Sequence, residues 1–283
     1  IRDVAPSRGL GDVYKRQPKY NLLYEAFGWE IPTYIHLPLI MGKDADGNVS
    51  KLSKRHGATG FYDLIDEGYL PEAIINYIAL LGWCPKDNQE IFTLKELEKA
   101  FDISGISKSP AVFDYDKLSW FNGEYIKAMT PEKFTEVAMP YYKKVFGDKQ
   151  MPYEKFAAIL QKRTTQLTQI PEMLDFFAEL PSYTKELFVN KKSKTNLENS
   201  PVVLKEAYDR LKAMPEWNET SIHDCLINMA VEKELKNGTV MWPVRIAAAG
   251  KTVTPGGAVE ILDILGRDES LARLEKGMAI LAE

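Results

Sequence analysis

The sequence predicts a mainly α-helical chain with a short stretch of β-structure near its beginning. Residues 33–41 are rich in β-branched and aromatic side chains and lie between Pro32 and Gly42, which is typical of a strand. After residue 60, apolar side chains recur at the three- and four-residue spacing of helices that bury one face. We therefore expect the chain to change from strand to helix near residue 60.

The first seventeen residues look foreign to the rest of the chain. They hold four basic and two acidic residues without a sustained apolar period, so neither helix nor strand is predicted. Residues 12–17 resemble a translated sequencing adaptor, and we expect residues 1–17 to be non-native, with a natural basic arm as the alternative. On the adaptor interpretation the native part begins near Pro18, and the chain is a C-terminal fragment.

Residues 18–27 predict a short amphipathic helix that ends at Gly28. In the predicted strand that follows, Pro38 has no N–H to donate to a neighbouring strand. This strand therefore cannot be paired on both sides along its whole length, as a central strand of a sheet would be. The turn at residues 44–48 has the spaced oxygen side chains of a calcium loop. However, Val49 stands where glycine is required and Arg55 where a bidentate glutamate belongs, so calcium is not expected.

Helix signals then follow one another to the C-terminus. A helix over residues 72–81 would bury Ala73, Ile74, Tyr77, Ile78 and Leu81. Thr93 and Glu96 have the spacing of a capping box. Four further helix starts are predicted where a capping hydroxyl precedes proline, at Ser109-Pro110, Thr130-Pro131, Ser200-Pro201 and Thr254-Pro255.

Composition narrows the class of protein. With 283 residues, 45% apolar and 27% charged, the chain fits roughly two globular domains. It has neither an apolar run long enough to span a membrane nor a secretory signal, and Cys84 and Cys225 are too few for a disulfide framework, so a cytoplasmic location is expected. The net charge of −4 gives no global sign of nucleic-acid binding, so any such partner depends on local features.

The segment from Lys51 to Arg55 places three cations and a hydroxyl within five residues, directly after the predicted strand and turn. Lysine ammonium groups on such a loop would offset the negative charge that grows on a departing pyrophosphate. A basic turn that only faces water is the alternative. The adjacent His56 has two interpretations as well, a phosphate contact or a turn residue before a helix.

The Lys51-Leu52-Ser53-Lys54-Arg55 segment resembles the KMSKS signature of class I aminoacyl-tRNA synthetases, in the form typical of the bacterial glutamyl-tRNA synthetase family. Further segments are similar to the same family, and together they cover the chain from residue 18 onward: residues 18–29, 36–40, 74–83 and 113–122 and, more weakly, 242–245 and 270–274.

This resemblance implies three domains after the foreign segment. Residues 18–60 would be the C-terminal end of a Rossmann-type α/β catalytic domain, of which only a remnant is present. Residues 61–130 would form a helical stem-contact domain, and residues 131–283 a helical anticodon-binding domain. The glutaminyl enzyme, with β-barrels after the signature, and the short paralogue that glutamylates queuosine fit the chain less well.

The resemblance also implies an activity, in which ATP activates glutamate to an adenylate and the glutamyl group passes to the 3′ end of the glutamate tRNA. Lys54 would contact the ATP phosphates, Lys51 would be a second loop cation, Ser53 and Arg55 would order the loop, and His56 would assist in binding. Magnesium would enter only as the nucleotide counter-ion, with no structural metal. The expected state is a monomer, and the glutamine tRNA is a possible second substrate.

The family's His-x-Gly-His type motif does not occur among His36, His56 and His223. We therefore expect the chain to be inactive alone, and a stand-alone, non-catalytic tRNA-binding helical module is the alternative function. Several other residues have two interpretations. Lys162, Arg163 and the lysines of residues 191–194 are candidate tRNA contacts or solvated charges. Arg245 and Arg273 are candidate anticodon-side tRNA contacts, and Trp120-Phe121-Asn122 is a base-stacking platform or part of a core.

Overall fold

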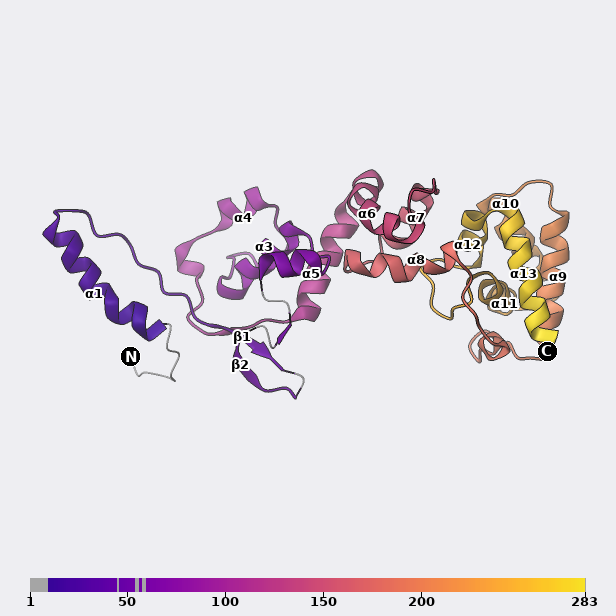
Figure 1. Ribbon diagram of the computed structural model, residues 1–283, viewed down its shortest axis with the longest axis horizontal. Coiled ribbons are helices and arrows are strands. Elements are labelled where there is room, and N and C mark those ends of the chain that lie inside the picture. Colours follow the sequence, from indigo (N-terminus) through magenta and orange to yellow (C-terminus); the bar gives the residue numbers. More distant parts are fainter. Residues whose placement is uncertain (1–9, 45, 54–55, 58–59, 283) are drawn as a thin grey trace.

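Helices make up most of the chain, as predicted, and they follow one another in an elongated arrangement (Figure 1). The computed structural model describes residues 10–44, 46–53, 56–57 and 60–282. Its elements are α1 (Leu10–Ala26), β1 (Ile40–Lys43), β2 (Val49–Lys51), α2 (Phe61–Asp66), α3 (Pro71–Gly82), α4 (Leu94–Ala100), η2 (Ile103–Gly105), β3 (Ala111–Val112), α5 (Tyr115–Ala128), α6 (Pro131–Phe146), α7 (Tyr153–Leu160), η3 (Leu167–Gln169), α8 (Ile170–Ala178), η4 (Lys185–Phe188), α9 (Asn199–Ala213), α10 (Glu219–Glu232), α11 (Asn237–Ala249), α12 (Ala258–Leu265) and α13 (Arg267–Ala282).

The β-structure is shorter than the sequence predicts. Only Ile40–Lys43 of the predicted strand forms β1, which pairs antiparallel with β2 and parallel with β3. Residues 33–39 are not in a strand, so that part of the prediction is wrong. A strand requires a partner, and among the described residues only those from Ile40 onward find one.

Helix α1 begins earlier than predicted. It runs from Leu10 and contains Pro18, so the expectation of no regular structure before residue 18 is wrong for residues 10–17. Apolar periodicity predicts a helix that buries one face. Leu22 and Phe27 are each 64% exposed, so this helix does not bury its apolar residues, and periodicity is a poor predictor of where it begins. Figure 1 shows α1 at one end of the molecule, apart from the other helices.

The predicted helix over residues 72–81 is confirmed as α3, but its buried face differs from the prediction. Ala73, Ile74 and Tyr77 are buried, whereas Leu81 is only half-buried and Ile78 is 42% exposed. The additional buried residue is Asn76, which accepts from Phe92 N at 2.8 Å and donates to a neighbouring carbonyl. Paired in this way, a buried amide costs little, and binary apolar patterning does not detect it.

Local capping chemistry predicts some helix starts well. Glu96 N donates to Thr93 Oγ1 at 3.3 Å and Thr93 N donates to Glu96 Oε2 at 2.7 Å, which confirms the capping box. Helix α6 begins after Thr130 as predicted, and α9 begins one residue before Ser200.

The other two predicted helix starts are wrong. Ser109-Pro110 leads into β3, and α5 is capped by Asp114 instead. After Thr254-Pro255, α12 begins only at Ala258, because the Thr254 hydroxyl donates to Gly256 O within a turn. A hydroxyl followed by proline is also typical of turns, so the pattern alone does not fix a helix start.

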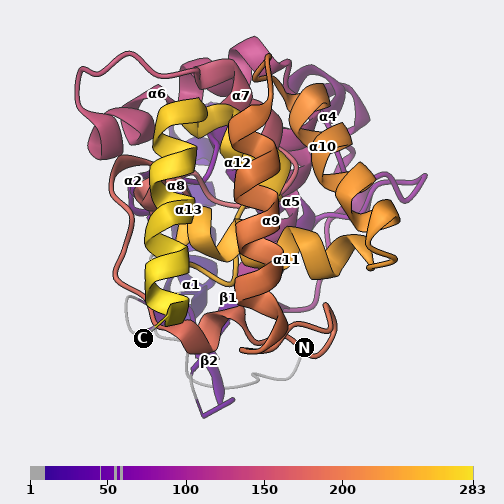
Figure 2. The same ribbon diagram turned by 90° about the vertical axis from the view of Figure 1, so that its right-hand side faces the viewer.

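Two principal groups of buried side chains organise the rest. A smaller core behind the strands contains Tyr77, Phe113 and Phe121. A larger one extends through α6–α13, where the expected all-helical structure is confirmed. Figure 2 shows α9 and α13 side by side in front of α11 and α12. Within the described ranges, we find no helix with the length and apolar character of a membrane span.

Candidate functional site

The basic loop begins at the end of a short hairpin. Asp44 shapes the hairpin turn, since its Oδ1 accepts from Asn48 N at 2.8 Å and Asp46 N at 3.1 Å. The hydrogen bond from the Asn48 backbone lowers the pKa of Asp44. The turn sets the register in which Lys51, at the end of β2, lies opposite Met41 of β1. Lys51 and Ser53 are both exposed.

His56 holds the described part of the loop together. Its Nδ1 accepts from Ser53 N at 3.0 Å and lies 3.2 Å from Ser53 Oγ, while Nε2 lies 3.2 Å from Ser50 Oγ. Both ring nitrogens are therefore occupied within the loop, which supports the turn interpretation of His56 rather than the phosphate contact. Lys54 and Arg55 lie outside the described residues, so their predicted roles stay predictions.

Close packing keeps the loop against the strands and α5. A Cβ atom at Gly42 would lie 2.6 Å from Cγ of His56, so the ring rests directly on β1. A Cβ atom at Gly57, where φ is +108°, would lie 3.0 Å from the hydroxyl of Tyr115 in α5. Leu52 packs on the smaller core. The loop thus has a fixed base, from which Lys51 projects into solvent as an available cation.

A second candidate site is a groove of about 710 Å³ between the segment after α7, helix α8 and the loop of residues 250–255. Arg163 follows α7 and lines this groove together with Gln169, Met173 and Leu187. Arg163 is exposed and forms no ion pair with another described residue. It also lines a smaller depression of about 300 Å³, as does the exposed Lys162.

Arg245 supports the groove from α11. Its guanidinium carbon lies 4.6 Å from the centre of the Trp242 ring, and Nη2 donates to Thr252 O at 3.0 Å. Burial, and then the nearby charge of Arg163, lowers the pKa of Arg245. The structure therefore brings two predicted RNA contacts, Arg163 and Arg245, close enough to interact electrostatically, although Arg245 also orders the groove wall.

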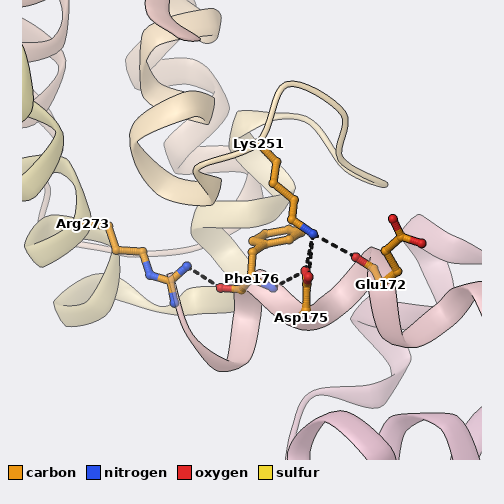
Figure 3. A network of polar contacts seen from close by, with 5 residues as sticks. All are labelled: Glu172, Asp175, Phe176, Lys251 and Arg273. Atoms are coloured by element: carbon orange, nitrogen blue, oxygen red, sulfur yellow. Dashed lines mark hydrogen bonds and ion pairs between the residues drawn. The ribbon is translucent and has the colours of Figure 1, made fainter. Parts of the chain in front are cut away.

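The groove wall is attached to α8 through Lys251. Its Nζ contacts the Asp175 carboxylate at 2.5 and 2.6 Å and donates to Glu172 O at 3.1 Å (Figure 3). This ion pair holds the 250–255 loop in position against α8. Because a helix start was predicted at Thr254-Pro255, the role of this loop in the groove wall was not predicted. In the sequence, only the glycines and threonines of residues 250–257 indicate a loop here.

Arg273 is not available as an RNA contact, so that prediction is wrong. The residue is only 4% exposed, and its Nη1 donates to Phe176 O at 2.7 Å (Figure 3) and to Ala248 O at 2.9 Å. These carbonyls belong to the last turns of α8 and α11, which lack partners within their own helices. The guanidinium therefore caps two helix ends at once, where the helix dipole also favours a cation.

The Trp120-Phe121-Asn122 segment belongs mainly to a buried core. Phe121 and Asn122 are fully buried, so the stacking-platform interpretation is wrong for both, and only Trp120 is partly exposed, at 44%. The lysines of residues 191–194, by contrast, lie on the surface.

Comparison with known proteins finds two family models in the chain. The model described as an anticodon binding domain matches residues 133–278, and the one described as "tRNA synthetases class I (E and Q), catalytic domain" matches residues 9–120. The second match begins ahead of Pro18, the residue at which the native part is expected to start.

Individual relatives agree with these models. The chain is 52% identical to a glutamate–tRNA ligase of Clostridium kluyveri and 51% identical to one of Clostridium tetani, each over 92% of this chain and 53% or 52% of the relative. A solved glutamate tRNA ligase from Elizabethkingia meningosepticum, in complex with its amino acid, gives a TM-score of 0.77 at 29% identity, covering 94% of this chain and 56% of that one. The chain thus spans about half the length of the curated relatives it matches.

Proposed function

Because the chain belongs to the glutamyl-tRNA synthetase family, within the class I aminoacyl-tRNA synthetases, we propose that it takes part in the ATP-dependent attachment of glutamate to a glutamate tRNA. Glutamate is first activated by ATP to an adenylate with loss of pyrophosphate. The glutamyl group then passes to the ribose at the 3′ end of the tRNA, and cytoplasmic protein synthesis consumes the product.

The observation that carries this proposal is the basic loop with its fixed base. His56 and the packing at Gly42 hold the loop against β1, and Lys51 leaves this base exposed to solvent. Lys54 and Arg55 follow within the same signature. Cations positioned before the reaction stabilise the charge that develops on the leaving pyrophosphate without reorganising during the step. The bound ATP would carry its own magnesium ion.

The groove supports the RNA half of the proposal. Arg163 lines the groove with a guanidinium that forms no ion pair among the described residues, Arg245 stacks on Trp242, and Lys251 fixes the groove wall. A guanidinium fork suits both phosphates and base edges, and the surrounding Met173 and Leu187 offer apolar contact to an unstacked base. We assign anticodon contact to this groove, with Arg163 as its principal cation.

Catalysis by the 283 residues alone is not part of the proposal. The three histidines lie outside the family's His-x-Gly-His type motif, which in the family holds adenine and phosphates. The loop supplies charge to phosphates, but charge alone does not place glutamate and ATP for reaction. We propose that the chain binds tRNA as a monomer and gains activity only together with the catalytic residues of a full-length enzyme.

A second candidate function is a non-catalytic tRNA-binding module. It is favoured by one observation, that the anticodon-binding model matches residues 133–278, which is more than half of the chain. Such a module would bind tRNA through the groove, and its basic loop would take no part in a reaction with ATP.

The test uses a reconstructed full-length enzyme and its Lys54→Ala variant. ATP–pyrophosphate exchange in the presence of glutamate tRNA should fall by about 100-fold or more, whereas tRNA affinity should remain nearly unchanged, because the lost charge acts on phosphate charge in the transition state. An unchanged exchange rate would remove Lys54 from the reaction. Charging of glutamate and glutamine tRNA transcripts by the same enzyme measures its substrate range, and aminoacylation by the 283-residue chain alone would contradict the proposed inactivity.

A further inference from the structure

The turn at residues 190–195, here called the lysine turn, concentrates positive charge. Lys191, Lys192 and Lys194 are exposed, and no described residue forms an ion pair with any of them. Some other lysines of the same helical region are paired, such as Lys205 with Asp209 at 2.5 Å. In a chain of net charge −4, three cations within four positions, each without an ion pair among the described residues, form a local patch.

The backbone of the lysine turn is held firmly. Asn190 and Thr195 exchange two backbone hydrogen bonds of 3.0 Å, and Asn190 Oδ1 accepts from Ser193 N at 2.9 Å. From the start of α11, Thr239 Oγ1 donates to Ser193 O at 2.7 Å. The lysine ammonium groups therefore project from an ordered platform rather than from a loose loop.

Lys194 adopts a left-handed backbone conformation with φ of +57°. Asn199 Nδ2 donates to its carbonyl at 2.9 Å and helps to hold it there. Non-glycine residues rarely adopt this conformation, whereas glycine does so without strain. Strained residues of this kind are concentrated at functional sites, so a lysine at this position points to a use for its charge.

The lysine turn lies close to the groove. Leu187 of η4 lines the groove, and Trp242 Nε1 donates to its carbonyl at 3.0 Å. Lys191 follows Leu187 by four residues, which span at most about 14 Å even when fully extended. A nucleic acid bound in the groove would therefore pass within reach of the lysines.

We propose that the lysine turn is a second RNA-contact surface, which binds backbone phosphates outside the groove. This inference rests on the proposed function, since RNA is the polyanion that the neighbouring groove is assigned to bind. Lysine is a point charge that suits phosphates but does not distinguish bases. The lysine turn therefore contributes affinity and salt dependence, and the choice of anticodon remains with the groove.

The test measures binding of the 283-residue chain to a glutamate tRNA transcript over a range of salt concentrations. The first variant carries Lys191→Gln, Lys192→Gln and Lys194→Gln. The control carries Lys133→Gln, Lys205→Gln and Lys233→Gln, which removes the same charge from exposed lysines that are already ion-paired. The plot of log affinity against log salt concentration has a negative slope. We expect the magnitude of this slope to decrease by about 2 to 3 in the first variant and by less than 1 in the control.

A transcript with an altered anticodon separates the two surfaces. The lysine-turn variant should lose affinity by the same factor for the original transcript and for the one with the altered anticodon. Arg163→Gln should instead reduce the difference in affinity between the two transcripts. No tRNA binding by the unmodified chain would refute the proposed function itself. Normal binding with an unchanged salt slope in the lysine-turn variant would refute only the second surface.

Lys194→Gly provides an independent check on folding. Glycine relieves the left-handed backbone and removes one charge, so the midpoint of thermal unfolding should stay equal or rise while tRNA affinity falls. A lysine that serves only the fold would give a lower midpoint with unchanged affinity. Binding to polyglutamate that depends on the lysine turn, without any effect on tRNA, would assign the surface to an acidic protein and overturn the proposal.

Discussion

Asn122 in α5 donates from Nδ2 to the backbone carbonyl of Thr165 at 2.6 Å, which joins the first helical part of the chain to the second. The same amide also accepts from Leu70 N at 2.8 Å and donates to Gly68 O at 3.3 Å. At the end of α5, Gln161 Nε2 donates to two further carbonyls. These hydrogen bonds attach residues 161–165, which include Arg163 of the groove, to α5. The first turn of α5 in turn packs against Gly57 of the basic loop through Tyr115.

Asn122→Ala should lower the free energy of unfolding by about 2 to 4 kcal/mol, because it leaves the buried Leu70 amide and the part-buried Thr165 carbonyl without their partner, whereas Gly68 O keeps its bond from Leu167 N at 3.0 Å. The measurement is denaturant unfolding followed by circular dichroism. Asn237→Ala, at an exposed position in α11, is the matched control and should change stability by less than about 0.5 kcal/mol. Equal effects of the two substitutions would show that the Asn122 bridge contributes nothing specific.

Arg273→Met and Arg163→Met form a second matched pair. Arg273→Met should cost about 2 to 4 kcal/mol of stability, since it removes the donor shared by the last turns of α8 and α11. It should leave the tRNA affinity of the folded molecules unchanged. Arg163→Met should do the reverse, with weaker tRNA binding and little change in stability. Comparable loss of affinity in both variants would contradict the assignment of Arg273 to the fold.

Local chemistry accounts for the parts of the fold that the sequence predicted correctly. The capping box of Thr93 and Glu96 and the helix start after Thr130 depend only on neighbouring residues. The parallel pairing of β1 with β3 joins residues far apart in the chain and has no local signal. The burial of Arg273 could not be predicted either, because its partners are helix ends that meet only after the helices pack.

Gly42 and His56 allow a coupled test of the loop. His56→Ala should speed hydrogen exchange at the Ser53 amide by about tenfold, since that amide loses its acceptor at 3.0 Å. Gly42→Ala should have a similar effect, because the new Cβ atom would displace the ring. In the double variant the two effects should not add, as expected for one shared contact. Additive effects would show that the ring does not rest on β1.

The candidate site was predictable from the sequence only where its residues are neighbours in the chain. The basic loop is a run of neighbouring residues, so its composition raised phosphate contact as one of two interpretations, and the resemblance to the KMSKS signature then favoured it. The groove is assembled from residues after α7, from α8, from η4 and from the 250–255 loop. The sequence offered Arg163 and Arg245 only as candidate RNA contacts, which stay predictions, and Lys251 acquires its role only through Asp175 in α8.

Alkaline pH should destabilise the smaller core through Tyr77. Burial raises the pKa of Tyr77 from 10.0 to about 12, and its hydroxyl accepts from Asp114 N at 2.7 Å. Since the pKa is higher in the folded state, this contribution to stability is complete below pH 10 and is lost as the pH rises towards 12. Unfolding free energies measured across this range should fall, and less steeply in Tyr77→Phe. The same slope in both proteins would assign the alkaline loss to other groups.

Tyr142→Phe should leave stability unchanged or raise it by up to about 1 kcal/mol. Tyr142 is fully buried, stacks on Tyr153 and has a hydroxyl without a hydrogen-bond partner among the described residues, so the substitution removes an unpaired polar atom and keeps the packing. The control is Tyr125→Phe, because the Tyr125 hydroxyl lies 2.6 Å from Asn76 Oδ1 and 2.5 Å from Phe92 O and shares its single proton between these two acceptors. That control should lose about 1 to 2 kcal/mol in the same denaturant series. If Tyr142→Phe instead proved as costly as Tyr125→Phe, the Tyr142 hydroxyl would have to be paired in solution, with an ordered water as the simplest partner.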